Sequence, residues 1–313
     1  MEYRTIKQQI VFLIRLYGST AANGSRRISP ETTQMRCAIL FLIVAQLKEG
    51  GFPISDLKNM RQKHLLYLAR RWEQENLSAG TMQNRWSLLK TVLEKWLGRH
   101  YLVKKLSSYL VNPNNARRVY AAQSDKSWSA KVNVDAVINT VAEKDAIVAN
   151  QLRLMLAFGL RRKEAIMFKP KVSDHGNFIS VTNGTKGGRH RIIDVSDSSQ
   201  RELLDKLKTQ TTSRLGHLGH PNKTLKQNIA RFDYVLRSLN ITYHGLGITS
   251  HGLRHQFAND LIEQLTGEPT PVRAGAQPID REKFEAARQI ATESLGHGRK
   301  SITTAYHGAI RKP

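Results

Sequence analysis

The sequence predicts a mainly α-helical protein of two domains, with one small antiparallel β-sheet in the second. Apolar residues recur at helical spacing through the first 110 residues, and two β-prone runs flank a Gly-rich turn near residue 185. A polar stretch lies between these regions. We therefore expect an α+β protein with a helical domain at residues 1–112, a linker at 113–131 and a mixed domain at 132–313.

Four helices are expected in the first domain, beginning with residues 6–17. The second is expected from Ser29-Pro30-Glu31, which offers an N-cap hydroxyl, a proline at the first helical position and an acid in the first turn. It should end near residue 48, before the Gly-Gly-Phe-Pro stretch. The remaining two are expected at about residues 56–75 and from Ser78 onward.

The last of these helices carries basic residues away from its apolar stripe. That stripe consists of Leu89, Val92, Leu93 and Trp96. Arg85, Lys90 and Lys95 lie off the stripe and are better candidates for contacts with phosphate groups. For Trp86 and Trp96 we expect core packing rather than stacking on bases.

The second domain is expected to resume as helices near residue 134. A β-hairpin follows, with strands at 178–182 and 189–195 joined by a Gly-rich turn at 183–188. From residue 201 onward the pattern is helical again.

The composition points to a polyanionic partner. The chain has 49 basic and 25 acidic side chains, for a formal net charge of +24. Residues 1–125 carry 20 basic and 8 acidic groups, and residues 126–313 carry 29 and 17. Because the two parts share the excess equally, the charge predicts two basic regions rather than one basic tail.

Cys37 is the only cysteine, which excludes an intrachain disulfide and a cysteine-based zinc cluster. The most apolar run, residues 37–47, is too short to span a bilayer, and the amino terminus lacks a signal-peptide pattern. We expect a cytoplasmic protein with no membrane partner.

Five short polar segments of the second domain form an ordered set. They are residues 159–164 with Arg161, the turn 185–189 with Lys186, residues 251–255 with His251 and Arg254, residues 295–297 with His297, and Tyr306. Each segment alone is common by chance. Their order is not, and neither is the interval of nine residues from His297 to Tyr306.

This set resembles the tyrosine recombinases, especially integrases of phages and other mobile elements. The resemblance is strong over residues 130–313 and weaker over residues 30–110. It implies a helical core-binding domain and a catalytic domain that cut and rejoin double-stranded DNA at attachment or recombination sites. It further implies a 3′-phosphotyrosine intermediate, no metal, ATP or other cofactor, and a homo-oligomer that is tetrameric in synapsis. The resemblance also implies a bacterial or phage-encoded setting.

The residue types suit that chemistry. A phosphodiester repels nucleophiles, and its transition state gathers negative charge that fixed cationic donors can stabilise. Arg161 and Arg254 are expected to clamp the phosphate, because a guanidinium stays charged and binds phosphate through two N–H groups. By the resemblance, His297 adds a further hydrogen bond to the phosphate.

Tyr306 is the expected nucleophile. A phenol is mostly protonated at neutral pH, so it needs a base, and His251 fits that role as in the family. Lys186, on the Gly-rich turn, is expected to protonate the leaving 5′ oxygen. Glu164 resembles the acidic residue of the family that orients the active-site histidine and lysine.

Several neighbours are ambiguous. The Gly-Leu-Arg register favours Arg161 over Arg162, and His255 is expected to be structural and to point away from Arg254. Arg189 and Arg191 are expected to contact DNA, with simple solvation as the alternative.

The chain departs from the family between Arg254 and His297, which are 43 residues apart. The extra segment, residues 266–288, begins with Gly and Pro and continues as a charged helix. It is either a passive loop or an exposed contact with a neighbouring subunit that compensates for the short tail after Tyr306.

Two other functions stay open at this stage. One is DNA relaxation by a type IB topoisomerase, which uses nearly the same chemistry. The other is sequence-specific DNA binding by a protein that has lost catalysis.

Overall fold

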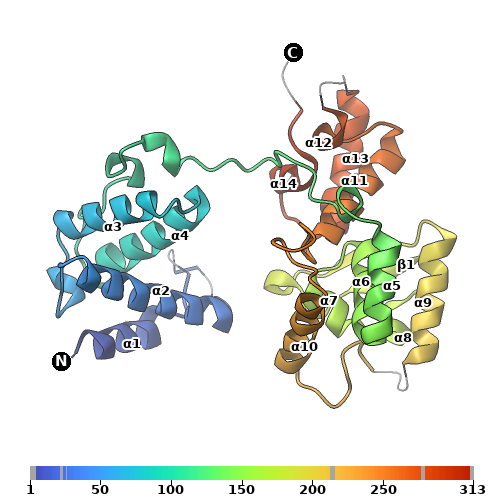
Figure 1. Cartoon of the computed structure of the whole chain (residues 1–313), viewed down its shortest axis with the longest axis horizontal. Coiled ribbons are helices and arrows are strands. Elements are labelled where there is room, and N and C mark those ends of the chain that lie inside the picture. Colours follow the sequence, from blue (N-terminus) through green and yellow to red (C-terminus); the bar gives the residue numbers. More distant parts are fainter. Residues whose placement is uncertain (1–4, 22–23, 26, 212–215, 276–278, 311–313) are drawn as a thin grey trace. The chain divides into compact units, whose positions relative to one another are not determined.

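The computed structural model describes residues 5–21, 24–25, 27–211, 216–275 and 279–310 (Figure 1). The chain divides into two compact units, Met1–Val119 and Tyr120–Pro313. This division falls inside the 113–131 stretch. Across the described ranges, no helix is long and apolar enough to cross a membrane.

Unit 1 is helical, as the sequence predicts. Its helices are α1 (Ile6–Tyr17), α2 (Pro30–Glu49), α3 (Gln62–Gln74) and α4 (Ala79–Lys90), followed by a π-helical turn at Thr91–Trp96. The hydroxyls of Ser29 and Ser78 accept hydrogen bonds from the backbone N–H groups of Thr32 and Thr81 at 3.3 and 3.2 Å, so both expected helix starts are confirmed. The third helix begins later than expected, because a short 3₁₀ turn at Leu57–Asn59 precedes it.

Aromatic side chains fill the core of unit 1. Trp72 and Trp86 are buried and meet edge to face at 6.3 Å. Their indole N–H groups donate to the Gln46 side chain and the Lys104 carbonyl, each at 2.9 Å, so both buried indole donors are paired. Trp96 stacks on Tyr17 at the edge of this core. The expected core role of Trp86 is confirmed.

Unit 2 is a helical domain with a two-stranded sheet. Its longer helices are α5 (Val134–Lys144), α6 (Ala146–Phe158), α9 (Ser198–Gln210), α10 (Leu225–Ser238), α11 (Gly252–Thr266) and α13 (Arg281–Ser294). Short helices are α7 (Arg162–Met167), α8 (Pro170–Ser173), α12 (Pro271–Ala274) and α14 (Thr304–His307). The strands β1 (Phe178–Val181) and β2 (Arg191–Asp194) pair antiparallel, with Val181 opposite Arg191. The predicted fold class is confirmed.

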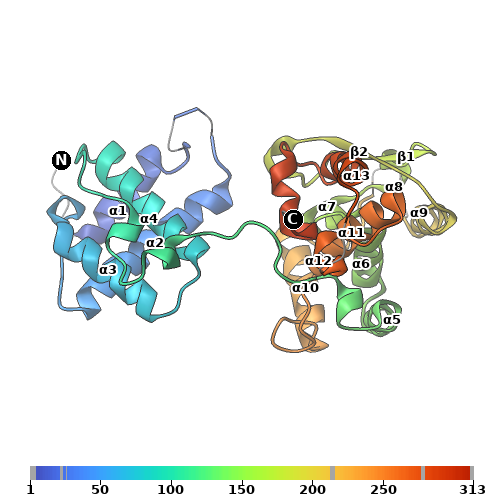
Figure 2. The same cartoon turned by 90° about the horizontal axis from the view of Figure 1, so that it is seen from above.

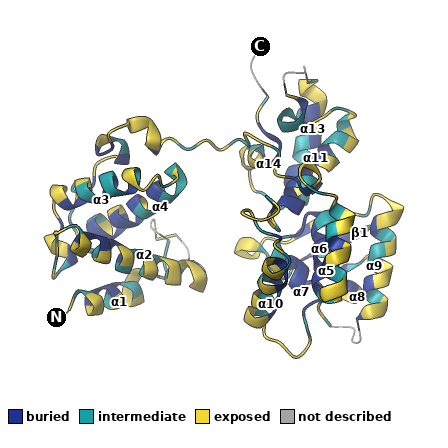
Figure 3. Cartoon of the chain, viewed as in Figure 1, coloured by how far each residue is buried: buried dark blue, intermediate teal, exposed yellow. Residues whose placement is uncertain are grey.

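Two helices organise unit 2 (Figure 2). Helix α6 packs on α5, α7, α9 and α11, and α11 also packs on α13 and α14. Their inward faces are buried and apolar, as Figure 3 shows in dark blue. Trp128 is fully buried in this core and donates to the Thr249 carbonyl at 2.7 Å, so the end of the 113–131 stretch packs with unit 2.

The charged helix expected in residues 266–288 is present as α13, with Arg281, Glu282 and Lys283 exposed, and its contact with a neighbouring subunit stays a prediction. Phe284, Ala287 and Ala291 of α13 are buried in a small cluster with Ile262 of α11. On another side of α13, Arg288 donates to the Lys300 carbonyl at 2.9 Å. Helix α13 is therefore part of the packed domain and supports the segment that follows it.

Helix α12, which precedes α13, is also held to unit 2 by ion pairs. Arg273 of α12 forms ion pairs with Asp125, Asp260 and Glu263 at 2.9, 2.8 and 2.7 Å. Residues 276–278 of the same segment lie outside the described residues. The ion pairs join α12 and the first part of unit 2 to α11.

Candidate active site

Tyr306 lies on α14 with only 5% of its surface exposed. Its hydroxyl accepts a hydrogen bond from Arg254 Nε at 3.2 Å and lies 3.2 Å from His297 Nε2. Because arginine can only donate, the hydroxyl hydrogen is free to point at the histidine nitrogen. The phenol is thus held between a cation and an imidazole.

Arg254 is fully buried on α11 and joins three separate segments. Besides Tyr306, it donates to the carbonyl oxygens of Gly159 and Leu295. Burial lowers its pKa to about 10, so the guanidinium stays charged at neutral pH. Each of its three nitrogens thus donates one hydrogen bond, and a buried charge needs such acceptors because an unpaired charge would be strongly destabilising.

The hydrogen bond to Arg254 requires a glycine at position 159. It ends α6 in the left-handed conformation, with φ of +57°. A Cβ there would lie 2.4 Å from the Phe257 ring. Only glycine turns the chain here without strain and presents its carbonyl to Arg254.

Three imidazole rings surround the Tyr306 ring. The ring centroids of His255, His297 and His251 lie 4.7, 5.5 and 5.8 Å from it. Desolvation lowers the pKa of each histidine to about 4, and the charge of Arg254 lowers the pKa of His251 and His297 further. All three rings are therefore neutral at pH 7, and a neutral ring can accept a proton.

The contacts differ in part from those expected. His297, rather than His251, makes the hydrogen bond to the hydroxyl among the described residues. His255, expected to be structural and to point away from Arg254, has its ring packed against the ring of Tyr306. The signal for His255 was present in the sequence, because residues i and i+4 share one face of a helix.

Arg161 and Glu164 form the base of the site. The Arg161 backbone N–H and Nη1 each donate to the Glu164 carboxylate at 2.8 Å. Arg162 points elsewhere and forms an ion pair with Asp233, which agrees with the predicted register. Arg161 is thus fixed at the start of α7 by a buried carboxylate.

Among the described residues, no hydrogen bond or ion pair joins Glu164 to a histidine or lysine, so the structure does not support the orienting role expected for it. Its second partner is Arg191, whose Nη1 and Nη2 donate to the two carboxylate oxygens at 3.0 and 2.7 Å. Burial raises the pKa of Glu164, but the hydrogen bonds and charges of Arg191 and Arg161 outweigh that effect and lower it to about 2. Arg191 is itself buried, so the structure does not support the expected DNA contact for it.

The candidate site residues in and after the hairpin turn, Lys186 and Arg189, are exposed. Lys186 begins a short 3₁₀ turn, and no hydrogen bond or ion pair joins it to the Tyr306 cluster within the described ranges. The Arg189 guanidinium lies against Gly298, where an added Cβ would be 2.6 Å from Nη1. A cavity of about 560 Å³ beside the site is lined by Arg189, Arg191 and His297 among others.

In unit 1, Lys90 is exposed and 3.8 Å from Glu94, and Lys95 is also exposed. Arg85 is half-buried, with its guanidinium 5.5 Å from the centre of the Trp72 ring. Lys90 also lines a hollow of about 500 Å³ with Lys105 and Arg117, two cations that the sequence analysis did not single out.

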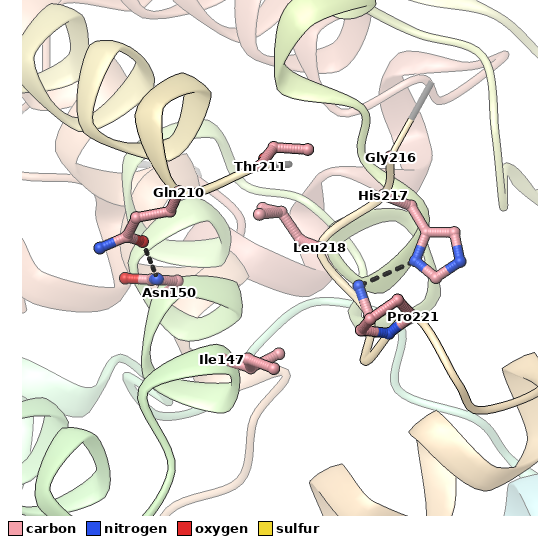
Figure 4. Close-up of a pocket in the computed structure, with 9 residues that line it drawn as sticks. Ile147, Asn150, Gln210, Thr211, Gly216, His217, Leu218 and Pro221 are labelled. Carbon is pink, nitrogen blue, oxygen red and sulfur yellow. Dashed lines mark hydrogen bonds between the residues drawn. The ribbon is translucent and has the colours of Figure 1, made fainter. Parts of the chain in front are cut away.

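Another cavity of unit 2, of about 460 Å³, lies among residues with no expected role (Figure 4). Asn150 donates to Gln210 there at 2.6 Å, and His217 Nδ1 accepts from the Gly219 backbone at 3.0 Å. Within the described residues, no cluster of three or more His, Cys, Asp or Glu could hold a metal ion.

The buried carboxylate gives the site a pH dependence. The pKa of Glu164 falls from its ordinary 4.5 to about 2 on folding. The ionised carboxylate therefore contributes fully to the free energy of unfolding above pH 4.5, and this contribution is lost as pH falls toward 2. We predict that the melting temperature of the wild type falls more steeply over that interval than that of Glu164→Gln. Thermal melting across pH 2–6 measures this; parallel curves would contradict the assignment.

Two family models match the chain, and together they cover most of it. One, described as "Integrase", matches residues 117–260, and the other, "Phage integrase, N-terminal", matches residues 20–103. No protein of curated function matches.

Solved structures share the fold at low sequence identity. The Tn1549 transposon integrase in complex with a circular intermediate DNA is 13% identical, with a TM-score of 0.60 over 98% of this chain and 96% of that chain. A lambda integrase dimer bound to a COC′ core site is 15% identical, with a TM-score of 0.58 over 95% and 94%. A lambda integrase tetramer bound to a Holliday junction is 16% identical, with a TM-score of 0.57 over 95% and 79%.

The matched residues include Arg161 and Arg254 and end before His297 and Tyr306. The chain belongs to the phage-integrase family of tyrosine recombinases, enzymes that break and rejoin DNA strands at specific sites.

Proposed function

We propose that this recombinase attacks DNA with Tyr306 and that it serves the integration or excision of a mobile element. The observation that carries the proposal is the buried Tyr306 hydroxyl, held by Arg254 and His297. Attack on the phosphorus would form a 3′-phosphotyrosine and release a 5′-hydroxyl. A 5′-hydroxyl attacking in reverse would reseal the strand and free Tyr306, so the bond energy is conserved.

Cations beside the hydroxyl supply the stabilisation that this step needs. Arg161 and Arg254 are fixed by the protein before the reaction begins, so their charge acts on the developing phosphorane without reorganisation. Since two guanidinium groups can carry this electrostatic role, we expect cleavage to need no divalent ion.

Proton transfer is assigned to three side chains. His251, neutral and beside the Tyr306 ring, is proposed as the acceptor of the phenol proton, and His297 as a donor to the phosphate. Because His297 holds the hydroxyl in this structure, the assignment requires its Nε2 to turn from Tyr306 to the phosphate. Lys186 is proposed as the acid that protonates the leaving 5′ oxygen.

DNA is the proposed partner of both units. Each part of the chain carries a surplus of basic side chains, and Lys90, Lys95, Arg85 and Arg189 are proposed to contact phosphates. Related folds have been solved as a dimer on a core site and as a tetramer on a Holliday junction. We propose that this chain likewise recombines DNA as a tetramer.

The nucleophile is tested with a nicked suicide substrate. Wild-type protein should become covalently attached to DNA at Tyr306, and Tyr306→Phe should form no adduct but bind DNA with unchanged affinity. Tyr243→Phe is the control, because Tyr243 is 72% exposed and should react like the wild type. Adduct formation by Tyr306→Phe, or a wild type that binds DNA without any adduct, would contradict the proposal.

The role of Lys186 is tested with a bridging 5′-phosphorothiolate substrate, whose sulfur leaves without being protonated. Lys186→Ala should cleave ordinary DNA poorly and the phosphorothiolate at close to the wild-type rate. The exposed Lys171→Ala variant controls for the lost charge. An equal loss on both substrates would assign Lys186 to phosphate binding instead.

A further inference from the structure

Arg191 lies on β2 and its side chain is only 4% exposed. Its guanidinium donates to both oxygens of Glu164 and, through Nε, to the Ser294 carbonyl at 2.8 Å. A single buried cation thus joins the hairpin, α7 and the end of α13.

Each of the three segments carries a residue of the proposed chemistry. Lys186 is in the turn of the hairpin, Arg161 begins α7, and His297 follows α13. The approach of Arg191 to the last segment is close, because a Cβ on Gly296 would lie 2.9 Å from Arg191 Cδ, and Gly296 has φ of +66°. The position of Arg191 therefore sets the spacing between α7 and the segment that bears His297.

Arg191 and Arg161 bind the Glu164 carboxylate in different ways. Arg191 covers both carboxylate oxygens, whereas Arg161 donates through one guanidinium nitrogen and its side chain remains 24% exposed. Two guanidinium groups share one carboxylate, so one positive charge is left over. Without Arg191, the buried carboxylate would be neutralised by Arg161.

We propose that Arg191 is a positioning residue that neutralises Glu164, so that Arg161 keeps its charge and its remaining N–H donors for the scissile phosphate. The proposal rests on the function proposed above. Arg191 acts through Arg161 and through the placement of His297, and it does not touch the reacting atoms.

Unit 2 offers a matched control. Asp174 is another buried carboxylate, with its side chain 3% exposed, and Arg201 donates to both of its oxygens. That pair joins α9 to the turn before β1, and neither element carries a residue of the proposed site. Arg201→Met therefore measures the effect of breaking such a pair on stability alone.

The test compares full-length Arg191→Met, Arg191→Lys, Arg201→Met and the Glu164→Gln/Arg191→Met double variant. The readouts are DNA affinity, melting temperature and the single-turnover rate of adduct formation on a nicked substrate. Arg191→Met should bind DNA normally but form adduct about 100-fold more slowly, the effect of losing one preorganised donor. Arg201→Met should melt earlier and cleave at the wild-type rate.

Charge compensation predicts a rescue. Removing the carboxylate frees Arg161, so the double variant should react at least about tenfold faster than Arg191→Met. It should also melt at a higher temperature, because it no longer buries a carboxylate that only the partly exposed Arg161 can pair with. Arg191→Lys, which keeps the charge, should also react faster than Arg191→Met.

Two results would overturn the proposal: cleavage by Arg191→Met at the wild-type rate, or a double variant that is neither faster nor more stable than the single one. The melting comparison decides the charge compensation even without cleavage. The wild-type adduct reports separately on the proposed function.

Discussion

The buried guanidinium of Arg254 is the interaction on which the rest of the site depends. It must be satisfied by acceptors once it leaves water, and those acceptors come from the end of α6, the end of α13 and α14. Meeting that demand brings Gly159, Leu295 and Tyr306 together. Packing of unit 2 and assembly of the site are therefore one process, and α13 contributes to it by supporting the segment between Leu295 and Tyr306.

A second network holds the charge in place around this centre. Glu164 divides its carboxylate between Arg161 and Arg191. Burial, followed by the positive charges of Arg254, Arg161 and Arg191, lowers the pKa of His297 to about 4 and keeps its ring neutral. The arrangement combines charged groups that cannot give up their protons with rings that can accept one. That combination suits a reaction in which a phenol is deprotonated beside a phosphate.

The sequence was sufficient to predict the fold class, the helix starts at Ser29 and Ser78, and the order of residues that meet at Tyr306. It could not distinguish Arg189 from Arg191, because it predicted a strand from residue 189, in which residues two apart share a face. In the structure β2 begins only at Arg191, and Arg191 turns inward, toward Glu164. The buried apolar face of α13 was not recognised from the sequence, because the helix also carries many charged residues. The contact of His297 with the phenol depends on the chain path after α13, which no local pattern specifies.

The most direct test of this account is the single-turnover cleavage rate of Arg254→Lys, measured with its DNA affinity and melting temperature. Lysine keeps one positive charge but lacks the planar set of donors that reaches Gly159, Leu295 and Tyr306 at once. The account predicts a folded variant that binds DNA within about threefold of wild type, because the basic surface is unchanged, and forms adduct at least about 100-fold more slowly. Wild-type cleavage by a folded Arg254→Lys protein would contradict it.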